Sequence, residues 1–474
     1  MKQSKPVQSD QWFCSLTPES LGSAEFKSRY QIKYAYLSGA MYQGIASKEL
    51  VVAMAQKGLL GFLGTGGRDI QAVENDIIAI QAELAVNEVF GVNLISQMEN
   101  PEAELNTVAM YVKHGVNIVE ASAYMQMTLA LVYYRVSGLS RAADGTVQCA
   151  HKIIAKLSRP EVAEKFLSPP PLKMVQTLLA ENKISKEQSE LSQLIPMCSD
   201  ICVEADSGGH TDRGIPSVLL PSIQSLRLTV LEKYAYQDAI HVGLAGGIGV
   251  PQSAASAFMM GADFILTGSI NQCTVEAATS DEVKDMLQSI NVQDTDYAPA
   301  GDMFEIGAKV QVLKKGNFFA ARANKLYDLY SQYRGWDDIP EATRKQIEQK
   351  YFQQGFAAVW AEVEQYHLQK GNSKIIEKAH KCKKHQLALV FKKYFSLTTR
   401  YALQGMSEKR IDFQVHTGPA LGAFNQWVKD TPLADWRNRR VAEVAEQLMC
   451  ETARFMSQEI NRLMTASRQQ DQQP

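Results

Sequence analysis

The chain has 474 residues, long enough for two domains or for one barrel with a large addition. Hydrophobic residues make up 45% and charged residues 21%, as in an ordinary globular protein, and the net charge of -2 argues against a nucleic-acid-binding protein. Seven widely spaced cysteines without a CxxC pair indicate reduced thiols and a cytoplasmic location. The N-terminus lacks an apolar signal core and no apolar run is long enough to span a bilayer, so we expect no membrane association.

Short apolar segments alternate with helical patterns from residue 31 to residue 272. These segments are 34–41, 59–63, 91–95, 116–120, 152–156, 200–205, 240–244 and 262–266. Buried parallel strands have this character, and their alternation with helices is typical of an α/β fold. A closed (β/α)8 TIM barrel is favoured over an open doubly wound sheet, because glycine-rich loops follow the last two strands. Residues 1–30 are then expected to be a loosely structured lead-in.

Three further segments are expected to lie outside the barrel. A proline-rich turn, 169–171, and the polar helices after it separate the fifth strand from the sixth, and we expect them to cover the barrel mouth. Residues 273–466 have mostly helical periodicity, strongest over 343–366 and 443–463, which predicts a helical cap completed by the last helices. The polar residues 467–474 are expected to be disordered.

Two glycine-rich loops follow the seventh and eighth strands. The first loop begins Ala245-Gly246-Gly247, and the second contains Gly268 and Ser269. Loops at these places in a (β/α)8 barrel bind phosphate through free backbone N–H groups. Ordinary turn chemistry is the alternative interpretation, because glycine is common in such turns. The presence of two adjacent loops favours the phosphate site.

A histidine follows two glycines at the end of the sixth strand. Gly208 and Gly209 allow a tight loop that projects His210 toward the carboxyl end of the barrel, where active sites lie. Histidine can donate or accept a proton near neutral pH. The alternative is a histidine that only caps a loop. The position one loop before the phosphate site favours a functional role.

Other strand ends bring residues to the same rim. Gly39, Ala40 and Met41 end the first strand and offer a flat backbone surface. Asn93 ends the third strand with donor and acceptor groups, and Lys156 ends the fifth with a positive charge. Together with the phosphate loops they would accommodate a large planar ligand with a phosphate tail, which suggests flavin mononucleotide (FMN).

Seven segments carry a resemblance to a known family. They are 39–41, 91–94, 204–212, 243–272, 300–305, 412–414 and 418–420, so the resemblance covers nearly the whole chain. In these segments the chain resembles the PfaD-type FMN-dependent enoyl reductases, which act in trans with polyketide and polyunsaturated fatty acid synthases. That family is related to the nitronate monooxygenases.

The resemblance implies a reaction and roles for named residues. NADPH would reduce the flavin, which would then reduce the 2,3 double bond of an enoyl thioester on an acyl carrier protein. His210 would supply or steer the proton for the α-carbon, and Lys156 would stabilise negative charge on the flavin. Gly246, Gly247 and the second glycine loop would hold the FMN phosphate. The acyl chain would enter between the barrel mouth and the helical cap.

Two other functions remain open at this stage. A nitronate monooxygenase would use the same fold and FMN, with His210 as a base and oxygen as the oxidant. The long region after residue 272 argues against it, because small nitronates need no such cap. A non-catalytic flavin-binding subunit of a synthase complex is the second alternative, and the presence of His210 and Lys156 argues against it. The sequence leaves the oligomeric state open.

A lysine-rich stretch near residues 374–393 allows two further interpretations. His380, Cys382 and nearby His385 hint at a metal site, but helical spacing does not gather them on one face, so a solvated basic face is favoured. Because acyl carrier proteins are acidic, Lys383, Lys384 and Lys392 are predicted to help dock the carrier. The alternative is a solvated basic surface without a partner.

Overall fold

A computed structural model of the protein describes residues 14–471, and in that part of the chain eight parallel strands close into a barrel. The strands are β1 (Tyr36–Ser38), β2 (Leu60–Leu63), β3 (Gly91–Ile95), β4 (Ile118–Ser122), β7 (Lys152–Leu157), β8 (Asp200–Glu204), β10 (Val242–Ala245) and β11 (Ile265–Thr267). Each lies within or overlaps a predicted segment, and β11 pairs with β1 to complete the closure. The predicted (β/α)8 fold is therefore confirmed.

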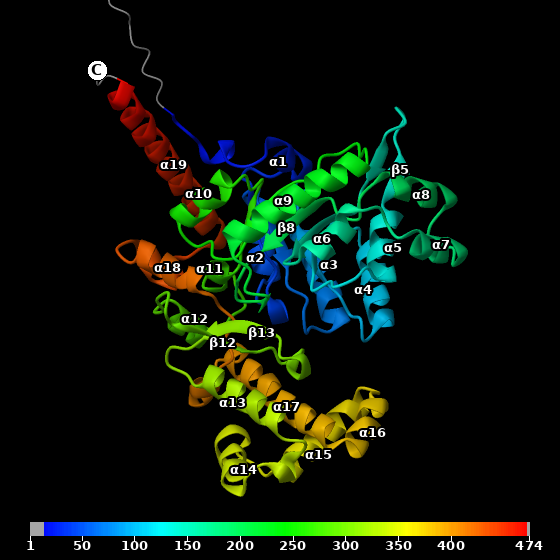
Figure 1. The fold of residues 1–474 in the computed structure, drawn as a ribbon, viewed down its shortest axis with the longest axis vertical. Coiled ribbons are helices and arrows are strands. Elements are labelled where there is room, and N and C mark those ends of the chain that lie inside the picture. Colours follow the sequence, from blue (N-terminus) through cyan, green and yellow to red (C-terminus); the bar gives the residue numbers. More distant parts are fainter. Residues whose placement is uncertain (1–13, 472–474) are drawn as a thin grey trace, which may run out of the picture.

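Amphipathic helices surround the barrel (Figure 1). They are α2 (Lys48–Gln56), α3 (Ile70–Glu83), α4 (Pro101–Lys113), α5 (Leu129–Ser137), α6 (Pro160–Leu167), α9 (Pro216–Lys233) and α10 (Pro251–Met259). Their starts follow local chemistry: the side chains of Ser47, Asp69, Asn100 and Thr128 each accept a hydrogen bond from an N–H of the first helical turn. Their apolar faces, such as that of α2, are buried against the strands. The strands are buried as well, and in β2 all four residues are.

The last barrel helix comes from the end of the chain. After β11, helix α11 (Ser269–Gln272) has only four residues. Helix α19 (Val441–Asp471) instead packs against both α10 and α2, which places it where the eighth barrel helix belongs. Because α19 extends to residue 471, the expected disorder is wrong for 467–471, and residues 472–474 lie outside the described part of the chain.

The expected loose lead-in is also wrong for its second half, since helix α1 (Ala24–Tyr30) forms there. Phe26 is buried and stacks on Phe264 with ring centroids 4.1 Å apart. The Tyr30 hydroxyl donates to Asp200, the first residue of β8, at 2.7 Å. Since Asp200 begins its strand, α1 covers the amino end of the barrel and leaves the opposite end for the site.

The insertion between the fifth and sixth barrel strands does not cover the mouth, contrary to the prediction. It contains α7 (Leu172–Ala180) and α8 (Lys186–Leu191), which pack against α5. Helix α8 also contacts the hairpin of β5 (Leu139–Arg141) and β6 (Val147–Cys149) near the carboxyl end of α5. In Figure 1 this group lies on the outer side of the barrel, away from the second lobe.

A second lobe, here called the helical lobe, faces the carboxyl ends of the barrel strands. Its elements are β12 (Thr295–Pro299), β13 (Lys309–Leu313), α13 (Phe319–Gln332), α14 (Glu341–Ile347), α15 (Phe356–Gln369), α16 (Ser373–Lys381) and α17 (Lys383–Leu403). An aromatic core that includes Phe304, Phe319 and Phe395 holds it together. The helical pattern expected over 343–366 is present as two helices, α14 and α15, and Gln353 between them adopts a left-handed conformation (φ 59°).

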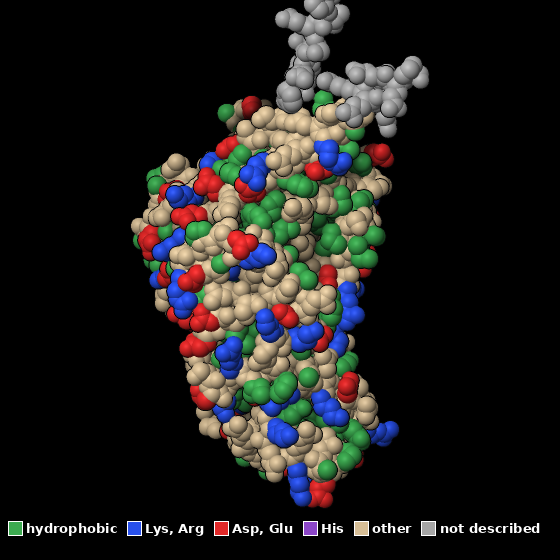
Figure 2. Space-filling model, turned by 90° about the vertical axis from the view of Figure 1, so that its left-hand side faces the viewer, with side chains coloured by type: hydrophobic (Ala, Val, Ile, Leu, Met, Phe, Trp, Pro, Cys, Tyr) green, Lys and Arg blue, Asp and Glu red, His purple; other side chains and the backbone are tan. Residues whose placement is uncertain are grey.

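Strands link the two lobes. β13 pairs antiparallel with β12 and also with β9 (His210–Thr211), which belongs to the loop after barrel strand β8. Helices α12 (Asp281–Leu287) and α18 (Pro419–Val428) lead into and out of the helical lobe, and they lie beside the barrel in Figure 1. From the side that carries α18 and α19, basic and acidic side chains are intermixed over both lobes (Figure 2).

Two further properties of the described residues bear on the sequence predictions. All seven cysteines, which lie within residues 14–471, are free thiols. Among the helices of the same residues, none combines the length and the apolar character that a membrane span requires.

Candidate active site

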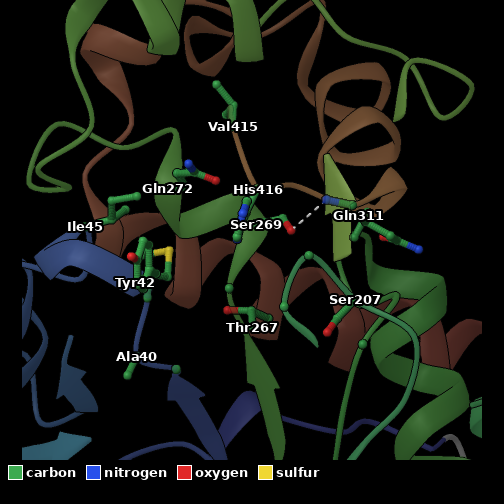
Figure 3. Close-up of a pocket in the computed structure, with 18 of the residues that line it drawn as sticks. Ala40, Tyr42, Ile45, Ser207, Thr267, Ser269, Gln272, Gln311, Val415 and His416 are labelled. Carbon is green, nitrogen blue, oxygen red and sulfur yellow. Dashed lines mark hydrogen bonds between the residues drawn. The ribbon is translucent and has the colours of Figure 1, made fainter. Parts of the chain in front are cut away.

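A pocket opens at the carboxyl end of the barrel, between the barrel loops and the helical lobe (Figure 3). Predicted site residues that line it are Gly39, Ala40, Met41, Lys156, Gly208, Gly209, Ala245, Gly246, Gly247, Gly268 and Ser269. The carboxyl ends of β1, β7, β8, β10 and β11 and the loops after them thus meet at one place, as the barrel topology predicts. Asn93 and His210, which were also predicted, lie outside the pocket wall.

The two glycine loops form a concave backbone surface. Gly246 and Gly247 have positive φ angles of 96° and 73°, which favour glycine. A side chain at Gly247 or Gly268 would extend into open space, so a ligand can approach the backbone there. Within residues 14–471, the N–H groups of Gly247, Ile248 and Ser269 have no hydrogen-bond acceptor. Free donors in an open concave loop match the needs of a phosphate group.

The helical lobe is attached directly to this surface. The backbone N–H of Gly418 donates to Ser269 Oγ at 3.0 Å, the dashed line in Figure 3. In the adjacent loop, the Asp206 carboxylate accepts from Gln311 Nε2 of β13 at 2.7 Å and from the Tyr297 hydroxyl of β12. These bonds hold the glycine loops in a defined position relative to the helical lobe.

Lys156 lies between two carboxylates in the pocket wall. Its Nζ is 3.5 Å from Glu204 Oε1 and 3.8 Å from Glu120 Oε1, and its side chain is 15% exposed. Burial alone would lower the pKa of Lys156, but the charges of Glu120 and Glu204 outweigh burial and raise it well above its usual value. Lys156 is therefore a permanently charged group that faces the pocket.

Glu120 was not predicted as a site residue, and it organises several residues that were. It is fully buried; burial raises the pKa of its carboxyl, and Lys156 opposes this. Its Oε2 accepts from the N–H of Ala40 at 3.2 Å and from Asn93 Nδ2 at 3.0 Å. Asn93 thus supports the site from behind the wall. A charged residue inside the apolar strand Val119-Glu120-Ala121 was the available signal.

His210 lies on β9 beside the pocket, and its side chain is 40% exposed. Its Nε2 is 2.9 Å from Asp302 Oδ1. Burial would lower the pKa of His210, but the hydrogen bond and charge of Asp302 raise it above its usual value. Asp302 falls in a segment that carried the family resemblance, but sequence alone gave no reason to pair residues 92 positions apart.

His416 is a second histidine at the site, and the sequence analysis did not identify it. It lines the pocket between Val415 and the glycine loops (Figure 3) and stacks on Tyr42 with ring centroids 6.1 Å apart. Gln414 Nε2 donates to His416 Nε2 at 2.7 Å. Burial, and then the charge of His210, lower the pKa of His416 to about 4, so the ring is neutral at neutral pH. Its position between two segments of the family resemblance was the available signal.

Apolar side chains from both lobes also line the pocket, and we call them the apolar arm. They are Ile45, Val283, Ala402, Leu403 and Val415. Two buried polar residues line the same pocket: Gln272, and Thr279, whose Oγ1 has no hydrogen-bond partner among residues 14–471. Such an arm fits a mainly apolar chain that carries a polar group. The whole site therefore combines a concave backbone surface with free N–H groups, the cation of Lys156, two histidines and an apolar arm.

Comparison with known proteins shows first the fold and then the family of this chain. FabK from Thermotoga maritima aligns over 93% of this chain and 99% of its own with a TM-score of 0.56, at 14% identity, which shows a shared fold. The enoyl reductase domain of MlnA from Bacillus amyloliquefaciens aligns over 94% of this chain and 99% of its own with a TM-score of 0.90, at 42% identity. The chain belongs to the family of this enoyl reductase domain, which confirms the resemblance found in the sequence.

Curated relatives are longer than this chain. The polyketide biosynthesis protein PksE of Bacillus subtilis (strain 168) is 52% identical over 96% of this chain, which spans 59% of PksE. One protein of the polyunsaturated fatty acid synthase of Thraustochytrium sp. is 40% identical over 87% of this chain, which spans 28% of that synthase protein. In addition, residues 333–413 match the family described as acyl-carrier-protein S-malonyltransferase, inserted helical domain.

Proposed function

We propose that this protein is an FMN-dependent enoyl reductase that uses NADPH to reduce the 2,3 double bond of enoyl thioesters carried by an acyl carrier protein. The observation that carries the proposal is one pocket in which a phosphate-binding surface, the charged Lys156 and an apolar arm meet. The family of the MlnA enoyl reductase domain and the polyketide and polyunsaturated fatty acid relatives support the reaction and its setting in a synthase pathway.

FMN fits the pocket as a resident cofactor. The free N–H groups of Gly247, Ile248 and Ser269 would hold its phosphate, and the backbone of Gly39–Met41 would support its ring. When bound, FMN supplies hydride transfer between NADPH and the substrate. Lys156 would stabilise negative charge at the edge of the ring. Glu120 and Glu204 keep Lys156 protonated and in place.

The two histidines would have different roles. The raised pKa of His210 favours its charged form, so His210 would supply or steer the proton that the α-carbon takes up during reduction. His416 is neutral and accepts from Gln414, and it would shape the pocket next to the reacting carbon atoms. The acyl chain would lie in the apolar arm, with Gln272 and Thr279 as hydrogen-bonding partners for its polar groups.

Anaerobic reduction of the purified protein with NADPH, followed by a crotonyl thioester or a nitronate, tests the proposal. We expect the flavin absorbance to be bleached by NADPH and restored by the crotonyl thioester alone. In a separate aerobic assay, oxygen consumption that depends on the nitronate and needs no NADPH would identify a nitronate monooxygenase instead. A flavin that binds but is not bleached by NADPH, and is not reoxidised by the thioester after chemical reduction, would indicate the non-catalytic subunit.

A further inference from the structure

The lysines that the sequence suggested for carrier docking are already occupied. Lys383 pairs with Asp337 at 3.0 Å, and Lys392 pairs with Glu305 at 3.0 Å. Lys384 donates to the carbonyl oxygen of Tyr333 at 2.7 Å, and its ammonium lies 4.1 Å from the centre of the Tyr330 ring. Since these lysines have partners in the helical lobe, they are poor candidates for a surface that attracts an acidic protein.

A different set of lysines on α16 is free. Lys374, Lys378 and Lys381 are exposed, and within residues 14–471 their ammonium groups have no ion-pair partner. Their spacing of four and three residues aligns them on one face of the helix. Ile376 and Ala379 are buried on the opposite face, so the lysines point away from the lobe.

Apolar side chains are exposed at the end of the helix that precedes α16. At the end of α15, Tyr366 is 56% exposed and Leu368 is 52% exposed, and Lys370 is exposed in the turn that leads to α16. Glu377 is the one carboxylate in the sequence of α16, so the face remains positive overall. Exposed apolar groups rimmed by charges of one sign are typical of protein interaction sites. We call Tyr366, Leu368, Lys370, Lys374, Lys378 and Lys381 the α16 surface.

One residue of the α16 surface, Tyr366, lies near the pocket wall. Burial raises the pKa of Tyr42 in the pocket wall, and Tyr366 is near enough to add to this. Burial lowers the pKa of His385, and the nearby charges of Lys378 and Lys392 lower it further. Lys392 Nζ in turn lies 3.5 Å from the carbonyl oxygen of Asp302, the partner of His210.

We propose that the α16 surface docks the acidic carrier protein that presents the enoyl thioester. This inference depends on the proposed function, and it names the surface that delivers the substrate. Its support is the free positive face, the exposed apolar groups at the end of the preceding helix, and the match of residues 333–413 to a helical domain found in an acyl-carrier-protein enzyme. A positive patch accelerates encounter with an acidic partner and fixes its orientation, and the effect weakens with salt.

The test reverses charge on this face in the full chain. The variant combines Lys374→Glu, Lys378→Glu and Lys381→Glu. The control combines Lys173→Glu, Lys325→Glu and Lys429→Glu, three exposed lysines on other elements, and has the same net charge. We measure kcat/KM with a carrier-bound enoyl substrate and with a small soluble thioester, at low and at high salt.

We expect the α16 variant to lose about tenfold or more in kcat/KM on the carrier-bound substrate at low salt, less at high salt, and to keep its activity on the small thioester. The control triple should stay within about twofold of wild type on both substrates. An unchanged carrier-bound rate, or an equal loss in the control triple, would overturn the proposal. A loss on both substrates calls for the milder Lys→Gln triple, and a loss on both again would also overturn it.

Direct binding separates this proposal from the proposed function. If wild-type protein reduces neither substrate, salt-dependent binding of an acidic carrier protein is measured by fluorescence anisotropy. Binding that the α16 variant weakens and the control triple retains would support the surface even though the reaction assignment had failed. Binding that both triples retain would overturn the surface.

Discussion

Removal of the Lys156 charge tests the electrostatic core of the site. Lys156 Nζ lies 3.5 Å from Glu204 and 3.8 Å from Glu120, and at an effective dielectric constant near 20 each contact is worth about 4 kcal/mol before desolvation. Loss of one partner of a buried pair costs about 3–5 kcal/mol, because a charge then stays buried alone. Lys156 is 15% exposed and Glu204 is partly exposed, so we expect Lys156→Met to lower the free energy of unfolding by about 3 kcal/mol near neutral pH.

The loss should shrink as the pH falls. Burial raises the pKa of Glu120 and Lys156 opposes this, so removing Lys156 raises that pKa further above its value in the unfolded chain. A carboxyl with a raised pKa favours folding when it is protonated. The destabilisation is therefore complete above the folded-state pKa of Glu120 and declines as the pH falls through it. Urea unfolding followed by circular dichroism at about pH 7.5 and about pH 5 measures both values.

A second substitution provides the control. Glu120→Gln removes the buried charge that Lys156→Met leaves without its partner, so the double variant should recover about 1–3 kcal/mol relative to the sum of the single changes. A single-variant loss below about 0.5 kcal/mol, within the range of ordinary surface changes, would refute the reasoning. So would a loss that is the same at both pH values, because it would point to packing and not to charge.

Three further outcomes are expected. The purified protein should be yellow, and mass analysis of the ligand released by heat should identify FMN, whereas FAD would contradict the assignment. Gly268→Val fills the open space at the second glycine loop and should weaken FMN binding at least tenfold. His210→Ala should slow enoyl reduction at least tenfold and flavin reduction by NADPH much less in stopped-flow measurements; equal losses would mean a structural role. Asp302→Asn removes the negative charge of Asp302, which helps to raise the pKa of His210, so the fall of the enoyl reduction rate with rising pH should move to lower pH. An unmoved profile would exclude protonated His210 as the donor.

Local sequence patterns were sufficient to identify the barrel. Each strand is a short apolar run that ends in a turn, as in Leu60–Leu63. Such a pattern involves only residues that are close in the sequence, so the sequence alone reveals it. The glycine loops at Gly246 and Gly268 were found for the same reason. The break between α14 and α15 at Gln353 could not be predicted, because the helical pattern of the sequence continues across it. A single residue in the left-handed conformation leaves no periodic signal.

Pairings between distant residues could not be predicted. The ion pairs of Lys156 with Glu120 and Glu204 depend on which strands become neighbours in the closed barrel. The His210–Asp302 contact depends on the pairing of β9 with β13, which joins a barrel loop to the helical lobe. Periodicity shows that a residue is on a strand or helix, but it does not show which distant residue will be its partner. The sequence therefore predicts single charged residues at the site, but not their ion pairs.

The position of α19 explains how one pocket can be built by two lobes. Because α19 fills the place of the eighth barrel helix, residues between α11 and α19 form an insertion within the last βα unit of the barrel. The insertion begins directly after the loop that contains Gly268 and Ser269, and it returns to that loop through the bond from Gly418 to Ser269. The insertion is thus fixed at both ends next to the loop that contains Gly268. Val283 and Val415 of the insertion line the same pocket as the barrel loops, so the apolar arm can differ while the barrel residues stay the same.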